Sequence, residues 1–197
     1  KETSNSANDS AVGIYSVNGS EVTNAGKVNV GGKNSIGILG VAYRVAPPEV
    51  DPITGNIIVP SKIVVDEFGV GAIGQGKATV LNKGQVSLDG ANATGIYIKN
   101  NNASATRATA VGTNDTTGVI TLSGDSSTGM SGDKATLENK GTININGQKS
   151  VGMFAKNSSD LKNSGTINLA TGLSENEPNI GIYAKDADTT VTNSKDI

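Results

Sequence analysis

The residues that could do chemistry in this chain are few, and their spacing completes no catalytic or metal site. The sequence has no Cys and no His, which removes thiol nucleophiles, Ser-His-Asp catalysis and the commonest zinc ligand. Gly69-x-Gly71-x-x-Gly74 has the glycine spacing of a dinucleotide-binding loop. A strand pattern follows it, however, where that loop needs the N-terminus of a helix. Asp186 and Asp188 lack the twelve-residue loop of a calcium site.

Charged side chains are scattered along the chain rather than gathered. Asp66-Glu67 is the only adjacent acidic pair, whereas polysaccharide lyases and hydrolases need converging carboxylates. The 16 basic and 18 acidic residues give a net charge of -2 and form no basic stripe for nucleic acid. No run approaches the roughly 18 apolar residues of a membrane-spanning helix. We therefore expect no enzyme, no bound metal, no cofactor and no nucleic-acid partner.

A short apolar phrase around a glycine recurs throughout the sequence. Its lead glycines are Gly13, Gly37, Gly71, Gly95, Gly129, Gly152 and Gly181. A second phrase, apolar-x-Asn-x-Gly-x-apolar-x-apolar, follows most copies, as in the stretch from Val80 to Leu88. A repeat of roughly 20 to 50 residues is typical of a stacked solenoid.

Apolar residues inside both phrases alternate with a period of two, as in Val28/Val30 and Ile143/Ile145. This period, with many β-branched residues, predicts short half-buried strands and not helices. We expect an all-β chain, a parallel β-helix of about seven rungs with three short strands in each. One such segment would span residues 1–197, and the start at Lys1 and the end in mid-repeat suggest a fragment of a longer solenoid.

One asparagine recurs at the same place in the second phrase. The members are Asn24, Asn82, Asn139, Asn163 and Asn193. Asparagine tolerates tight turns, and stacked copies can bond to the rungs above and below. We predict an asparagine ladder at one corner, with a structural role and no ligand.

Three stretches depart from the repeat and are predicted to be inserts, at about residues 42–61, 101–117 and 171–178. The first holds four of the five prolines, which cannot donate to a strand ladder. The chain has two arginines, Arg44 and Arg107, one in each long insert. Because loops on a rigid scaffold often carry recognition, we hypothesise a binding surface with Tyr43, Arg44 and Arg107 at its rim. We expect the two inserts to start two rungs apart, roughly 10 Å. Decoration of the rod is the competing interpretation.

Four of the six aromatic residues share one repeat position: Tyr15, Tyr97, Phe154 and Tyr183. Alternation points them outward. They would shield the sheet face or pack under an insert, or they would form a platform for sugar rings.

The units "AVGIYSVNGSEVTNAGKVNVGGKNSIGIL" and "SVGMFAKNSSDLKNSGTINL" resemble the passenger domains of type Va autotransporters, above all the large outer-membrane adhesins of fusobacteria. The resemblance implies a right-handed parallel β-helix, displayed on the outer membrane by a C-terminal β-barrel of the same full-length chain. It implies an extracellular adhesin segment that binds a protein or glycan on host or bacterial cells. A passive spacer and a polysaccharide-degrading β-helix enzyme are the alternatives.

Overall fold

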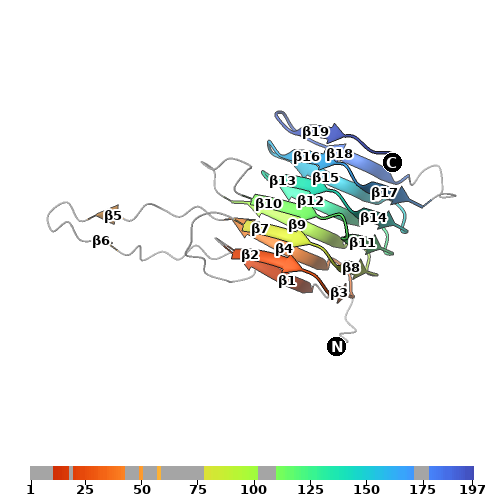
Figure 1. Cartoon of the computed structure of the whole chain (residues 1–197), viewed down its shortest axis with the longest axis horizontal. Helices are drawn as coiled ribbons and strands as arrows, with labels where there is room; N and C mark the ends of the chain where they lie inside the picture. Colours follow the sequence, from red (N-terminus) through yellow and green to blue (C-terminus); the bar gives the residue numbers. More distant parts are fainter. Residues whose placement is uncertain are drawn as a thin grey trace.

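The computed structural model describes residues 11–17, 20–42, 49–50, 57–58, 78–101, 110–170 and 178–197. Regular structure in these ranges consists of β-strands, and they contain no helix long and apolar enough to cross a membrane. The strands form three parallel sheets and one separate antiparallel pair (Figure 1).

Sheet A holds the strands that carry the lead glycines, and each strand pairs in parallel with the next. Its strands are β1 (Val12–Val17), β4 (Ile36–Ala42), β9 (Thr94–Asn100), β12 (Thr128–Asp133), β15 (Val151–Lys156) and β18 (Ile180–Ala184).

Sheet B holds the strands that end at the repeated asparagine. They are β2 (Ser20–Asn24), β7 (Ala78–Asn82), β10 (Ala110–Asn114), β13 (Thr136–Asn139), β16 (Asp160–Asn163) and β19 (Thr190–Asn193). Sheet C follows the repeated asparagine and comprises β3 (Lys27–Val30), β8 (Gln85–Leu88), β11 (Val119–Leu122), β14 (Thr142–Ile145) and β17 (Thr166–Leu169).

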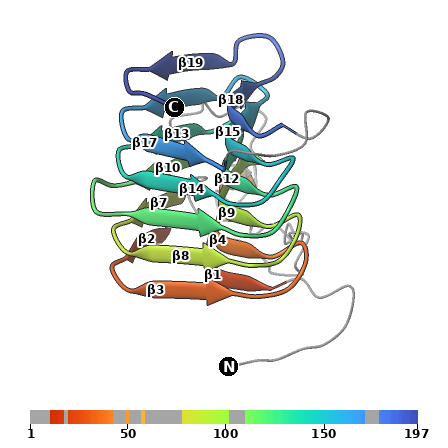
Figure 2. The ribbon, with the colours of Figure 1, turned by 90° about the vertical axis from the view of Figure 1, so that its right-hand side faces the viewer.

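The chain visits sheets A, B and C in turn, so that one strand from each makes a rung, and the rungs stack (Figure 2). β1, β2 and β3 form rung 1; β4, β7 and β8 form rung 2; β9, β10 and β11 form rung 3. Rungs 4 and 5 run from β12 to β14 and from β15 to β17, and β18 and β19 belong to rung 6. The prediction of a parallel β-helix with three strands per rung is confirmed.

The core lies between the three sheets and is built from the apolar residues that alternate along the strands. Ile96 of sheet A, Leu137 of sheet B and Ile143 of sheet C each have 0% exposure. One continuous cluster runs from Val28 to Ile167. Because each rung contributes only a few side chains, burial depends on the rungs above and below.

The lead glycines from Gly13 to Gly152 in sheet A face valine or isoleucine side chains of sheet C. A Cβ built on Gly129 would stand 2.6 Å from Cγ2 of Ile143 and 2.5 Å from the carbonyl oxygen of Gly152. The same contacts recur at Gly95, with Ile120 and Gly129. Such separations are far inside van der Waals contact, so only glycine fits at this repeat position.

The corner from sheet C to sheet A is made by a left-handed residue followed by a small one. The left-handed residues are Asn34, Asn92, Ser126 and Lys149, with φ between 54° and 57°. Asparagine accepts this conformation more readily than most residues. The corner therefore repeats in geometry while its sequence varies.

The predicted rung led by Gly71 does not stand where the repeat placed it. Gly71 lies outside the described residues, but β4 pairs directly with β9, with Ile36 opposite Thr94. No strand therefore separates the lead glycines Gly37 and Gly95. Between β4 and β7 the structure describes only β5 (Glu49–Val50) and β6 (Ile57–Ile58), an antiparallel pair that lies apart from the stack (Figure 1).

Candidate functional site

The corner from sheet A to sheet B is where the two long inserts leave the stack. Ala42, the last residue of β4, pairs with Asn100, the last residue of β9. The amide of Asn101 donates to the carbonyl oxygen of Ala42 at 2.7 Å. The chain re-enters sheet B at Ala78 and Ala110, which also pair with each other. Both inserts thus begin and end at neighbouring points of adjacent rungs.

In rung 4 the chain passes from sheet A to sheet B without an insert. Asp133 pairs with Lys99 and Thr136 pairs with Val111, so consecutive Lys134 and Ala135 occupy the positions of Asn100 and Ala110. Residues 43–77 and 101–109 are therefore additions to an otherwise complete rung.

This register corrects two predictions about the inserts. Their roots are one rung apart, about 4.8 Å at ordinary strand spacing, and not two rungs apart, because the expected rung at Gly71 does not intervene. The second insert is also shorter than the predicted 101–117, because Ala110–Asn114 forms β10 of the stack. Strand β10 was not predicted because its sequence is rich in Ala, Thr and Asn, and its only large apolar residue is Val111. Val111 points outward, opposite Thr79.

The residues of the hypothesised binding rim, Tyr43, Arg44 and Arg107, lie outside the described residues. Tyr43 directly follows Ala42, and Arg107 belongs to the insert between Asn100 and Ala110. The structure places the roots of both inserts together, and the rim remains a hypothesis. Most of the third predicted insert, residues 171–177, also lies outside the described ranges, between β17 and β18.

The repeated asparagines stack at the corner from sheet B to sheet C. Each side-chain amide donates to the amide oxygen of the next rung at 2.8 Å, in the order Asn24, Asn82, Asn114, Asn139, Asn163 and Asn193. Asn114 is a member that the sequence analysis missed. Asn114 pairs with Asn82 in the structure. In the sequence it precedes Gly118 by four residues, because the two extra residues Thr116 and Thr117 interrupt the Asn-x-Gly spacing by which the other members were found.

A second buried polar column, also missed, runs up the corner from sheet C to sheet A. The amide of Ala93 donates to Oγ of Ser127 at 3.1 Å, and the amide of Ser127 donates to Oγ of Ser150 at 3.0 Å. The amide of Ser150 then donates to Oδ1 of Asn179 at 2.9 Å. The sequence feature that could have predicted this column is a small polar residue two places before the lead glycine. The column satisfies buried amides and offers no open side to a ligand.

The aromatic residues share one outward row of sheet A, as predicted from their repeat position. In register, the row reads Tyr15, Leu39, Tyr97, Ser131, Phe154 and Tyr183. Leu39 and Val41 are 0% and 3% exposed and form a small apolar cluster with Tyr15 and Tyr97 outside the main core. The rings of Phe154 and Tyr183 lie 5.5 Å apart, and Tyr183 is 45% exposed.

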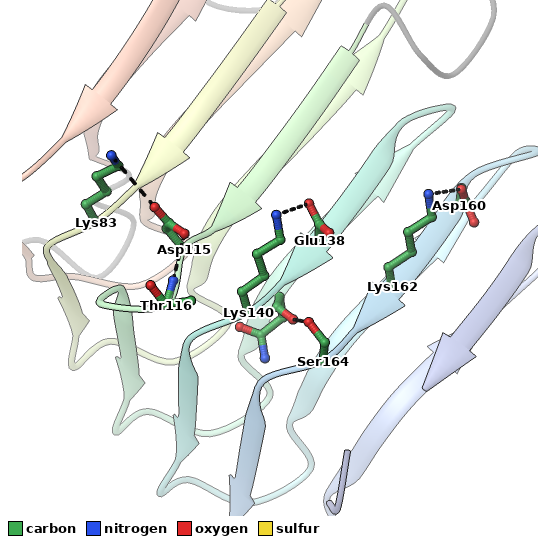
Figure 3. A network of polar contacts seen from close by, with 9 residues as sticks. Lys83, Asp115, Thr116, Glu138, Lys140, Asp160, Lys162 and Ser164 are labelled. Carbon is green, nitrogen blue, oxygen red and sulfur yellow. Dashed lines mark hydrogen bonds and ion pairs between the residues drawn. The ribbon is translucent and has the colours of Figure 1, made fainter. Parts of the chain in front are cut away.

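Three lysines of sheet B and its following corner lie beside carboxylates (Figure 3). Lys140 lies 3.0 Å from Glu138, Lys162 lies 3.4 Å from Asp160, and Lys83 lies 3.8 Å from Asp115. Exposed pairs of this kind contribute at most about 1 kcal/mol each to stability. In the part of the chain that the structure describes, no three acidic side chains gather as a metal site would require.

Comparison with protein families matches residues 96–194 to the model of the BigA third pectate lyase-like domain. Comparison with curated proteins and with solved structures gave no match. The match begins at Ile96 in β9 and runs through β19, so it covers rungs 3 to 6, including the insert of rung 3, and excludes the insert of rung 2. It supports a β-helix domain of a bacterial cell-surface protein, in agreement with the stacked parallel sheets. This chain belongs to the family of the BigA third pectate lyase-like domain.

Proposed function

We propose that this domain is an adhesin segment of an autotransporter passenger, whose inserts bind a receptor on host or bacterial cells. The observation that carries the proposal is the common root of the two long inserts on adjacent rungs. A stack of in-register rungs is stiff, and loops held by a stiff scaffold are the usual place for recognition. A spacer would need no insertion, and rung 4 is complete without one.

The receptor is a protein or a glycan, and the hypothesised rim of Tyr43, Arg44 and Arg107 would contact it. Arginine and tyrosine are enriched among the residues that dominate binding energy at interfaces. In this proposal the segment stands on the outer membrane, displayed by a C-terminal β-barrel of the same full-length chain, as in the large fusobacterial adhesins. The domain acts without catalysis, which fits the pairing of Asp115, Glu138 and Asp160 with lysines.

The test is an insert-free protein designed on rung 4, in which Asn100 is joined to Ala110 and Ala42, changed to asparagine, is joined to Ala78. Asparagine suits this junction because the corresponding Lys134 has φ of 55°. Labelled parent and insert-free proteins are titrated onto panels of host and bacterial cells. We expect saturable binding by the parent and its loss in the insert-free protein, with circular dichroism showing an unchanged β-sheet spectrum.

A matched control replaces only residues 171–177 by a short turn, because this stretch leaves from a different corner of the stack. It should bind as the parent does. In a second step, Arg44→Ala with Arg107→Ala should weaken binding at least about tenfold, the effect of losing one or two contacts of about 1.4 kcal/mol. Absence of binding by the parent would leave the segment as a spacer, and full binding by the double variant would remove the arginines from the interface.

A further inference from the structure

The outward face of sheet C is polar and almost uncharged over five strands. Two side chains of each strand point outward, in two rows that run along the stack. One row reads Lys27, Gln85, Val119, Thr142 and Thr166, and the other reads Asn29, Ser87, Thr121, Asn144 and Asn168. Lys27 is the one charged residue among these positions of the described strands.

The second row is a ladder of side chains that can both donate and accept hydrogen bonds. The amide of Asn168 donates to Oδ1 of Asn144 at 2.8 Å, and the amide of Asn144 lies 3.5 Å from Oγ1 of Thr121. These contacts link the side chains of the last three rungs in the row. The rows repeat at the strand spacing of about 4.8 Å, so the face presents one polar group per rung along a straight line.

Two shallow hollows flank this face across rungs 1 to 3. One has a volume of about 250 Å³ and is lined by Asn29, Ser87, Thr121, Asp89 and Ser123, together with Val30, Gly31 and Leu88. The other has a volume of about 350 Å³ and is lined by Lys27, Lys83, Gln85 and Thr117, among others. Ligand sites usually have volumes of about 300 to 1,000 Å³, so the second hollow lies near the lower end of this range and the first lies just below it. Polar side chains from successive rungs line both hollows beside apolar residues and glycines.

The other two outer faces have a different character. Sheet B carries Glu21, Glu138, Asp160 and Lys162 in its outward rows. Sheet A carries aliphatic and aromatic residues beside Lys99, Asp133 and Lys156. The lack of charge on sheet C is therefore a property of that face and not of the chain as a whole.

We propose that the outward face of sheet C binds an extended neutral glycan that lies along the stack, with sugar units in the two hollows. Hydroxyl groups both donate and accept, and Asn, Gln, Ser and Thr side chains match them in both roles. A polyanion would find only Lys27 on the described face, while Lys83 and Lys140 at its edge are paired with Asp115 and Glu138. A protein partner would lack the aromatic and arginine anchors that dominate protein interfaces. The carboxylate of Asp89 provides an additional acceptor for a sugar hydroxyl at the rim of the first hollow.

The test compares two arginine substitutions that differ only in the face they occupy. Thr121 points outward from sheet C and Thr113 points outward from sheet B in the same rung, and both are half-buried. Thr121→Arg fills the first hollow and places a charge on the face, whereas Thr113→Arg does neither. Asn29→Arg, at an exposed position of the same hollow, is a second blocking variant should Thr121→Arg unfold. The proteins are applied to an array of neutral, sialylated and sulfated oligosaccharides of increasing length.

We expect the parent and Thr113→Arg to retain neutral oligosaccharides, more tightly as length increases, and either blocking variant to bind at least about tenfold more weakly. The insert-free protein should keep this binding, so the glycan face and the insert-borne adhesive surface can succeed or fail separately. Retention of acidic sugars only, no retention of any neutral sugar, or equal loss in Thr113→Arg would overturn the proposal. So would parent dimerisation in light scattering that Thr121→Arg abolishes without any glycan binding, because the occupant would then be a second copy.

Discussion

At each lead glycine of sheet A from Gly13 to Gly152, atoms of neighbouring strands occupy the space that a Cβ would need. At Gly95, Gly129 and Gly152 the missing Cβ would overlap Cγ2 of a sheet C isoleucine and a backbone oxygen of the next rung. The isoleucine could shift by changing rotamer, but the backbone oxygen cannot move without breaking the strand ladder. The glycine is thus required by close packing against sheet C and against the backbone of the next strand of sheet A, and not by a positive φ.

Gly129→Ala should accordingly destabilise the protein strongly, since overpacking in a closed core costs about 1 to 3 kcal/mol. Gly26→Ala is the matched control, because a Cβ on Gly26 meets nothing within 4 Å. Chemical denaturation monitored by circular dichroism would measure both. Equal stability of the two variants would mean that sheet A can move away from sheet C at little cost.

At the scale of the elements, the asparagine ladder ties the ends of the sheet B strands together. Asn139 is 0% exposed, accepts from Asn114 and donates to Asn163, each at 2.8 Å. Removal of its amide would take the 2.8 Å acceptor from Asn114, which keeps contacts at 3.3 Å with the carbonyl oxygens of Gly118 and Thr142, and the 2.8 Å donor from Asn163. A buried polar group that loses its partner costs about 1 to 3 kcal/mol.

We therefore expect Asn139→Ala to lower the free energy of unfolding by about 2 to 5 kcal/mol. Asn193→Ala, at the exposed end of the ladder, should cost less than about 1 kcal/mol. Thermal unfolding of the two variants beside the parent gives the comparison. A similar cost at both positions would show that the corner turn matters and the stacked amides do not.

The sequence predicted the positions of the strands better than it predicted which strands pair with each other. Strict alternation in stretches such as Ile143 to Ile145 reports burial directly, and so the strands and their inward residues were found from the chain alone. Strand pairing does not show in the sequence in the same way. The phrase Val70-Gly71-Ala72-Ile73 matches the repeat, yet β4 pairs directly with β9. Because this phrase was counted as a rung, the two inserts were predicted to start two rungs apart instead of one. The short strand Ala110–Asn114 was missed because its core positions are filled by Ala110, Gly112 and Asn114, which are small or polar.

At the scale of the whole molecule, stability is shared between neighbouring rungs. Ile143 is 0% exposed and packs within the cluster that runs the length of the core. Ile143→Asp would place a carboxylate there without a partner, and we expect a loss of about 4 kcal/mol or more. Because each rung buries its neighbours, the loss should spread beyond rung 4.

Hydrogen exchange would show this spread as reduced protection in rungs 3 and 5, as well as in rung 4. Lys99→Ala, an outward substitution on rung 3, should leave the exchange pattern unchanged. Loss of protection confined to rung 4 would contradict the view that rungs fold as coupled units.

The asparagine ladder also gives the rod a direction. All of its bonds donate in the same sense, from Asn24 toward Asn193, where the last amide turns to the carbonyl oxygen of Lys195 at 2.8 Å. The amide dipoles therefore add along the axis, and the two ends of the ladder differ in chemistry: the amide oxygen of Asn24 accepts from the backbone amide of Gly26, whereas the amide of Asn193 donates to Lys195. Any rung that extends such a ladder must arrive with the same orientation, so two rods could join head to tail but not head to head.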